Sequence, residues 1–184
     1  MKAGVRAVGI AESTQGGVST LAGVVVRADR TVDGLSFGTC TVGGSDATDA
    51  VVETVQRLGR DDVRYVVLAG IALAWYNVVD LHAVHDAVDR PVLSVTFEAS
   101  AGLETAIEDA FDGTAREHRL AVYHRQPSRT PVEVNGENVY VRAVGIDDSE
   151  ARDVVRAFTP EGGRPEPLRV ARFAARAGDE LRRA

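Results

Sequence analysis

Cysteine is almost missing from this sequence, since Cys40 is the only one among 184 residues. An intramolecular disulfide is therefore excluded, and the fold must rest on a buried apolar core, which a chain of this length can supply. Long apolar runs are also missing, because residues 63–79 are interrupted by glycine and asparagine. We therefore predict no transmembrane helix and expect no membrane partner. No signal-peptide pattern stands near the N-terminus, so we expect a cytoplasmic protein.

Lysine is the other scarce residue: Lys2 is the only one, and the remaining basic side chains are arginines. With 21 basic and 27 acidic residues, the protein is acidic and carries a formal net charge of -6. Nonspecific binding to nucleic acid depends on neutralising phosphates, which a net negative surface opposes. Any nucleic-acid site must therefore be a local basic patch.

The apolar patterns predict one α/β domain over residues 1–184, without repeats or a long linker. Three β-branched runs come first, joined by short connections that favour antiparallel pairing. Helical and strand periods then alternate, and the continuous apolar run at 63–68 is typical of a parallel strand covered on both faces. Strands are predicted at 5–11, 20–28, 32–42, 63–68 and 91–97, and helices from the Ser45-Asp46 cap signal to Gly59 and at 77–88, 103–111, 147–158 and 168–183.

The C-terminal part is less regular. Residues 116–124 fit either a helix or a strand. From about residue 130 the sequence predicts a hairpin around Asn135-Gly136, which favours a two-residue turn. The last helix follows a segment rich in proline and glycine at 160–167.

This order of elements indicates a ribonuclease H-like fold. An antiparallel three-strand meander continues into parallel strands in the order 3-2-1-4-5, with helices on both sides. Ligands of open α/β sheets bind where neighbouring parallel strands end. Ala11 and Glu12 end the first strand, and Ala69 and Gly70 end the fourth, so we expect the functional crevice between them.

Four strings of the sequence resemble an archaeal family of unknown function that is related to endonuclease V. They are RAVGIAES (6–13), VGGSDATDAV (42–51), LAGIALAWYNVVDLHAVHDAVDRPVLSV (68–95) and GGRPEPLRVARFAA (162–175). The resemblance covers nearly the whole chain and implies the same ribonuclease H-like fold. It also implies nuclease chemistry in which carboxylates hold magnesium or manganese, a hard cation that prefers oxygen ligands.

This sequence departs from the family pattern at the positions where the resemblance implies acids. The family tends to have paired aspartates where Ala11-Glu12 stands, an aspartate at Gly43, and aspartate or asparagine at Ala69. Alanine and glycine side chains cannot bind a cation, so the acidic site is degenerate and efficient hydrolysis is not expected. Glu12 remains, but strand alternation places it on the opposite face from Ala11.

Three nearby acids stay as candidates. We predict Glu12, Asp46 and Asp80 as catalytic residues and Glu12 and Asp46 as metal ligands. Asp46 also fits a helix N-cap, which is the more common role of aspartate at such a position. Asp80 either faces the crevice or simply lies in the first turn of a helix that Asn77 caps. Trp75, directly after the fourth strand, either stacks on a base or packs in the core.

The last helix carries the only local cationic ridge. We predict nucleic-acid contacts from four arginines: Arg164, Arg169, Arg172 and Arg176. The apolar stripe of the same helix, which would dock on the sheet or on a partner, consists of Val170, Phe173, Ala174, Ala177 and Leu181. An ordinary amphipathic helix with a solvated face is the simpler interpretation, because no aromatic residues alternate with the arginines.

Three functions remain open. The first is an endonuclease V-like protein that is catalytically impaired and acts by binding DNA or RNA, or by assembly with itself or a protein partner. The second is an active endonuclease that uses magnesium or manganese, and the third is a structural partner protein without a nucleic-acid role.

Overall fold

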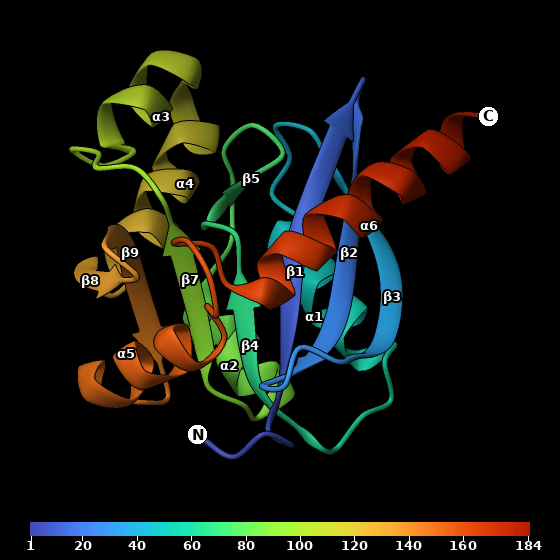
Figure 1. Cartoon of the computed structure of the whole chain (residues 1–184). Coiled ribbons are helices and arrows are strands. Elements are labelled where there is room, and N and C mark those ends of the chain that lie inside the picture. Colours follow the sequence, from blue (N-terminus) through green and yellow to red (C-terminus); the bar gives the residue numbers. More distant parts are fainter.

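A seven-stranded mixed sheet forms the centre of the computed structural model, which describes residues 1–184 (Figure 1). The strand order is β3-β2-β1-β4-β7-β9-β8, and β5 and β6 form a separate two-stranded sheet. The strands are β1 Arg6–Gln15, β2 Val18–Arg27, β3 Val32–Thr41, β4 Val63–Leu68, β5 Ala72–Leu73, β6 Asn77–Val78, β7 Val92–Thr96, β8 Thr130–Val134 and β9 Glu137–Val144. The helices are α1 Ala47–Gln56, α2 Leu81–Val88, α3 Glu104–Ala110, α4 Gly113–Arg125, α5 Asp148–Ala157 and α6 Glu166–Arg183.

The first five places in the sheet confirm the predicted ribonuclease H-like order, with β7 as the fifth strand. β1, β2 and β3 pair antiparallel, whereas β4 lies parallel to both β1 and β7. The predicted hairpin also forms, with positive φ at Asn135 and Gly136 as its turn requires. It extends the same sheet, because β9 pairs with β7 and β8 forms the outer edge.

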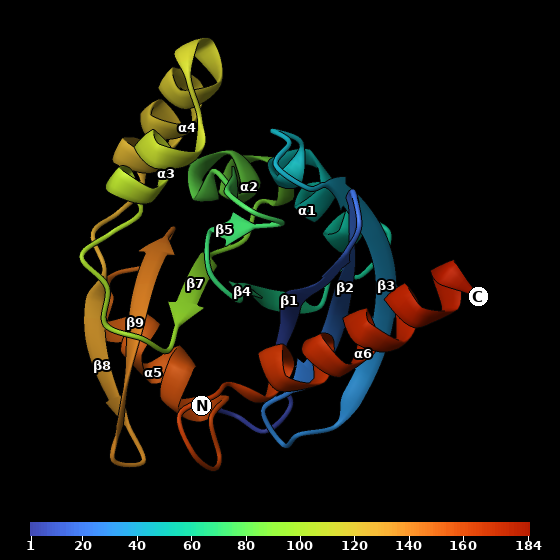
Figure 2. The same ribbon diagram turned by 90° about the horizontal axis from the view of Figure 1, so that it is seen from above.

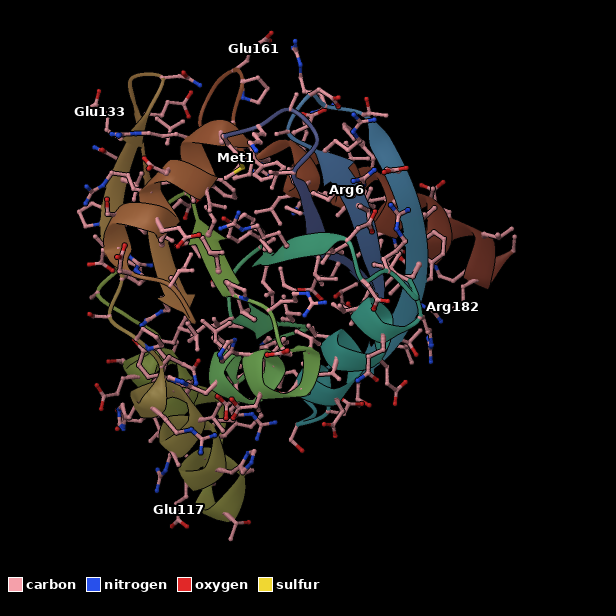
Figure 3. All side chains as sticks on the ribbon, turned by 90° about the horizontal axis from the view of Figure 1, so that it is seen from below. Met1, Arg6, Glu117, Glu133, Glu161 and Arg182 are labelled. Carbon is pink, nitrogen blue, oxygen red and sulfur yellow. The ribbon has the colours of Figure 1, made fainter.

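Helices cover both faces of the sheet. Figure 2 shows α1 and α2 on one side and α5 and α6 on the other. Because successive side chains of a strand point to opposite faces, β1 contributes to both layers of the core. Val8 and Ile10 join a cluster with α1 and α2, whereas Ala7 joins a cluster with α5. Helices α3 and α4 pack on each other, and Glu117 marks their outer end in Figure 3.

Helix α6 lies close against β1 and β2. Its buried residues are Pro167, Leu168, Ala171, Ala175 and Asp179. The predicted docking stripe was therefore wrong in part: Val170 and Ala174 pack on the cluster around Ala11, but Phe173 and Leu181 are 58% and 79% exposed. Small side chains at the contact let the helix approach the sheet, where Gly9 lies against Pro167.

Two further predictions are settled by the structure. Helix α2 begins at Leu81 and not at residue 77, because residues 77–78 form β6 and Asp80 is the N-cap. Residues 116–124, which fitted a helix or a strand, lie in α4. Every helix is too short or too polar to span a bilayer.

Replacing Gly9 by alanine tests how tightly α6 is held. A Cβ at this position would stand 2.3 Å from the carbonyl carbon and oxygen of Pro167, and backbone atoms cannot swing aside. We expect Gly9→Ala to lower the free energy of unfolding in urea by about 3 kcal/mol, as overpacked contacts do. Gly4→Ala is the control, because no atom lies within 4 Å of a Cβ there. Equal stability of the two variants would contradict the close contact.

Candidate functional site

Strand β4 ends at Leu68, beside Ile10, but β1 continues to Gln15, so the predicted end of the first strand at Ala11-Glu12 was wrong. The expected ligand positions Ala11 and Ala69 carry methyl groups. The backbone N–H of Ala69 donates to the carbonyl of Ile10, one residue before Ala11. Ala11 is 1% exposed and forms a small apolar cluster with two valines of β2 and with Ala171 of α6. Ala69 packs against the same cluster. Helix α6 therefore covers two of the three positions where the resemblance implies acids.

Glu12 points to the opposite face of the sheet, as strand alternation predicts. It pairs with Leu21, which belongs to the core between the sheet and helices α1 and α2. Its carboxylate accepts hydrogen bonds from the backbone N–H of Ala74, at 2.8 Å to each oxygen, and from the hydroxyls of Thr14 and Ser19. Glu12 therefore joins the loop between β5 and β6 to β1.

Asp46 stands before α1, on the same side as Glu12, but its side chain does not cap the helix. The prediction of a side-chain N-cap was wrong, because the carboxylate instead accepts hydrogen bonds from the backbone N–H and hydroxyl of Thr41 and from Asn77 Nδ2. Asn77 Oδ1 takes over the capping by accepting from the N–H of Ala47. Burial raises the pKa of Asp46, but the hydrogen bonds from Asn77 and Thr41 outweigh it and hold that pKa below its usual value.

Cys40 shows that Glu12 and Asp46 share one neighbourhood. Burial, followed by the charges of Glu12 and Asp46, raises the pKa of the Cys40 thiol to about 12. Even so, no group of three or more His, Cys, Asp or Glu side chains could hold a metal ion. The residues present therefore do not fit the carboxylate-held magnesium site that the resemblance implies.

Asp80, the third candidate acid, stabilises the contact between two helices. It is buried and accepts from the backbone N–H groups at the start of α2. It also pairs with Arg125, the last residue of α4, and with Gln126 directly after it. The interpretation in which Asn77 caps this helix was wrong, since Asp80 is itself the N-cap of α2. Its contacts join α4 to α2.

The loop between β5 and β6 has an uncommon backbone. Residues 74–76 have φ angles of 43°, 58° and 57°, a region that residues other than glycine rarely adopt. Such conformations cost on the order of 1–3 kcal/mol each and cluster at functional sites. Glu12 holds the start of this loop, and Arg119 donates to the carbonyl of Tyr76 at its end. The guanidinium of Arg119 also donates to the carbonyls of residues 43 and 44.

Gly43, the third expected ligand position, lies against this loop. Its φ is +67°, and a Cβ there would stand 2.8 Å from the ring of Trp75. The indole therefore occupies the space that a side chain at residue 43 would need. Trp75 also packs on Phe111, at 5.1 Å between ring centroids, yet is 56% exposed. It is thus both packed on one face and open on the other.

Three of the four predicted arginines come together. The charges of Arg172 and Arg176 act on Arg164, whose pKa is lowered by burial first and by these two neighbours next. The Arg164 guanidinium lies 4.3 Å from the centroid of the Phe97 ring, just after β7. Arg169 differs, because it makes two hydrogen bonds to Glu166. We call Arg164, Arg172 and Arg176 the arginine cluster.

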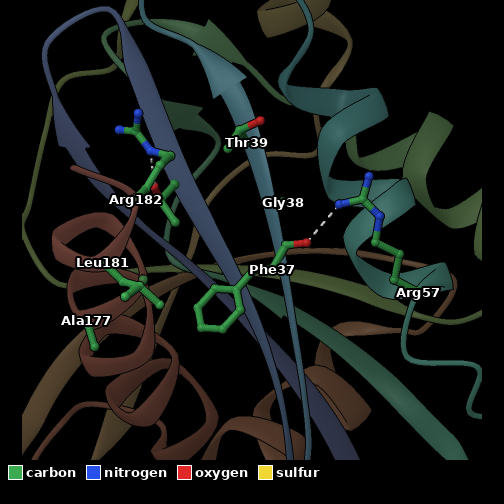
Figure 4. Close-up of a pocket in the computed structure, with 9 residues that line it drawn as sticks. Phe37, Gly38, Thr39, Arg57, Ala177, Leu181 and Arg182 are labelled. Carbon is green, nitrogen blue, oxygen red and sulfur yellow. Dashed lines mark hydrogen bonds between the residues drawn. The ribbon is translucent and has the colours of Figure 1, made fainter. Parts of the chain in front are cut away.

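An apolar groove lies between α6 and β3, away from these residues. Figure 4 shows Phe37 facing Ala177 and Leu181 across it, with Arg57 donating to the Phe37 carbonyl. None of the predicted site residues lines this groove.

No spacing in the sequence pointed to Arg119 as a site residue. Its guanidinium donates to the carbonyl groups of Gly43, Gly44 and Tyr76, which lie in two loops far from Arg119 in the sequence. Every residue has a backbone carbonyl, so the sequence does not indicate which carbonyls accept from Arg119, and only the fold reveals this contact.

Comparison with known proteins agrees with the fold and with the resemblance. The model of a family described as "Endonuclease dU" matches residues 3–178. A UPF0215 protein of Pyrobaculum calidifontis is 37% identical, with 90% of this chain and 92% of that protein covered. A UPF0215 protein of Thermococcus kodakarensis is 36% identical, with 85% and 80% covered.

Solved structures agree as well. A protein of unknown function from Archaeoglobus fulgidus has a TM-score of 0.83 at 25% identity, covering 94% of this chain and 97% of that one. Endonuclease V of Ciona intestinalis, in complex with a 24mer DNA containing an inosine, has a TM-score of 0.66 at 12% identity, with 96% and 87% covered. Human ENDOV has a TM-score of 0.64 at 15% identity, with 98% and 86% covered. The predicted archaeal family is therefore confirmed, and so is the fold, which the endonuclease V structures share.

The hydrogen bonds of Asp46 predict how stability depends on pH. Because its pKa is lower in the folded chain, this carboxylate stabilises the fold above its unfolded pKa of about 3.9 and loses that effect as pH falls through the folded value. We expect Asp46→Ala to cost about 2 kcal/mol in urea unfolding at neutral pH, since it removes the acceptor of the Thr41 N–H and hydroxyl and one of the two acceptors of Asn77 Nδ2.

The difference between Asp46→Ala and the wild type should stay constant from about pH 5 to 8 and shrink below about pH 4. Asp49→Ala is the matched control, an exposed acid in the first turn of α1. A difference that persists unchanged at acid pH would argue against a role for the charged carboxylate.

Proposed function

The chain belongs to the endonuclease dU family, and we propose that it binds nucleic acid through its arginine cluster while hydrolysing it weakly or not at all. The observation that carries the proposal is the packing of Ala11 and Ala69 under α6. At the edge of the sheet where a related nuclease would need acids, this chain has methyl groups. The acid that α6 does bring to this face, Asp179, accepts hydrogen bonds from Ser13 and Thr20 and pairs with Arg182, whereas Arg172 and Arg176 follow Ala171 and Ala175 on the exposed side of the helix.

The third vacated position supports the same proposal. A carboxylate at residue 43 would meet the indole of Trp75 and would also need a backbone that aspartate adopts only at a cost. The absence of an acid at residue 43 therefore depends on the position of the loop at 74–76, which Glu12 and Arg119 hold in place. Restoring one acid would require this loop to move.

Charge explains why the arginine cluster favours phosphate over a cation. Three guanidinium groups that repel one another also repel a divalent ion, whereas a phosphate relieves the repulsion. A local cluster of this kind is what an acidic protein with a net charge of -6 needs to bind nucleic acid. The name of the family makes DNA that contains deoxyuridine the first ligand to test.

The arginine cluster can be tested by salt-dependent binding. We expect Arg172→Ala with Arg176→Ala to weaken binding of a uracil-containing oligonucleotide by about tenfold or more, since each lost charge-assisted bond counts for more than 1 kcal/mol. The slope of log K against log salt should fall by roughly 1.4 for single strands, at 0.7 per phosphate contact.

The matched control for the arginine cluster is Arg152→Ala with Arg156→Ala, which removes two charges from α5. If both double variants bind alike, the cluster is not the nucleic-acid site.

Cleavage assays separate the proposal from an active metal-dependent endonuclease. Uracil- and inosine-containing DNA and RNA should bind to the protein but remain intact in magnesium or manganese. Metal-dependent cleavage that disappears in Glu12→Gln would favour the alternative, in which Glu12 and Asp46 form a rearranged site near Cys40. Neither binding nor cleavage would instead indicate a structural partner protein.

A further inference from the structure

A second cationic site lies on the other side of the sheet edge. A cavity of about 200 Å³ opens at the carboxyl ends of β4 and β7, between the sheet and α4. Arg129 and Arg142 line it together with Tyr123 and Tyr140, and no Asp or Glu side chain is among its lining residues. Hydroxyl groups complete the lining: Ser94, Thr96 and Ser100. Neither arginine belongs to the arginine cluster.

The two guanidinium groups are held in fixed positions. Arg142 donates to the carbonyl of Pro127 and lies 5.6 Å from the centroid of the Tyr123 ring. Arg129 donates to the carbonyl of Ser100 and lies 4.7 Å from the centroid of the Tyr140 ring. Each cation therefore has an aromatic face and a carbonyl, but neither contact supplies a full negative charge.

The positive charges of Arg129 and Arg142 favour the binding of an anion in this cavity. Burial lowers the pKa of Arg142, and the charge of Arg129 lowers it further, so the two cations repel each other. Most buried charges in proteins are paired, because an unpaired charge costs desolvation energy. Guanidinium groups bind phosphate oxygens through parallel N–H bonds, and nearby hydroxyls can donate to the remaining oxygens.

We propose that this cavity binds a phosphate group, with Arg129 and Arg142 as its charged donors and the hydroxyl of Ser94 as a neutral one. The phosphate comes either from a strand end or from the backbone of a nucleic acid. This second part rests on the proposed function, whereas binding of a free phosphate does not.

The position of the cavity supports a link with the arginine cluster. Ala69 lines the cavity and also packs on the Ala11 cluster beneath α6. On β7, Thr96 lines the cavity, and the next residue, Phe97, contacts Arg164. A strand that crosses the end of β7 would thus meet cations on both sides of the sheet.

Calorimetric titration with inorganic phosphate and with deoxyuridine 5′-monophosphate tests the cavity without any oligonucleotide. We expect both to bind, deoxyuridine without phosphate not to bind, and Arg129→Gln and Arg142→Gln each to weaken binding at least tenfold. Arg152→Gln on α5, across the sheet from the cavity, should bind like the wild type. Thermal unfolding of each variant verifies that it is folded, and Arg129→Gln decides alone if Arg142→Gln is not.

The proposal is overturned if the wild type shows no binding at about 10 mM phosphate, a concentration that detects millimolar affinity. It is also overturned if folded Arg129→Gln binds phosphate as tightly as the wild type. Oligonucleotides with a 5′-phosphate or a 5′-hydroxyl then distinguish the source: tighter binding of the former indicates a strand end, and equal competition with phosphate indicates the backbone. None of these measurements depends on Arg172 or Arg176. If the cavity does not bind phosphate, the proposal that the arginine cluster binds nucleic acid still stands.

Discussion

The close contact between α6 and β1 is the constraint on which the rest of the structure depends. Gly9 and Ala11 offer almost no side-chain volume, and Pro167 and Ala171 pack directly on them. Dense packing leaves no room for a hydrated cation and its oxygen ligands between the helix and the sheet. The same helix brings arginines to the edge of the crevice. In the function proposed above, this packing excludes a metal ion from the crevice and leaves the arginines free to bind phosphate.

The acids that remain near the crevice stabilise loops. Glu12 holds the left-handed loop after β5. Asp46, before α1, accepts from Thr41 at the end of β3 and from Asn77 in β6, and Asp80 joins α2 to α4. Each accepts several hydrogen bonds, which favour the charged form and fix its position. A carboxylate held in this way is costly to redirect towards a ligand.

Periodicity predicted most of the fold, because strands and helices bury side chains at different intervals. The order of the first five strands and the face of Glu12 both followed from it. Contacts between distant segments could not be predicted: Asn77, not Asp46, supplies the acceptor at the start of α1. The stripe on α6 was misjudged for a related reason. We predicted that Phe173 and Leu181 face the sheet because they belong to the apolar stripe of the helix. The helix instead buries small residues, because Gly9 of β1 lets its backbone come close to the strand.

Paramagnetic broadening of amide signals by manganese tests most directly the claim that the crevice beneath α6 binds no divalent metal ion. Manganese added in equal amount to protein labelled with nitrogen-15 should leave the amide signals of Ala11, Ala69 and Ala171 sharp. Loss of these three signals, with signals on α5 unaffected, would place a bound ion beneath α6 and contradict the account.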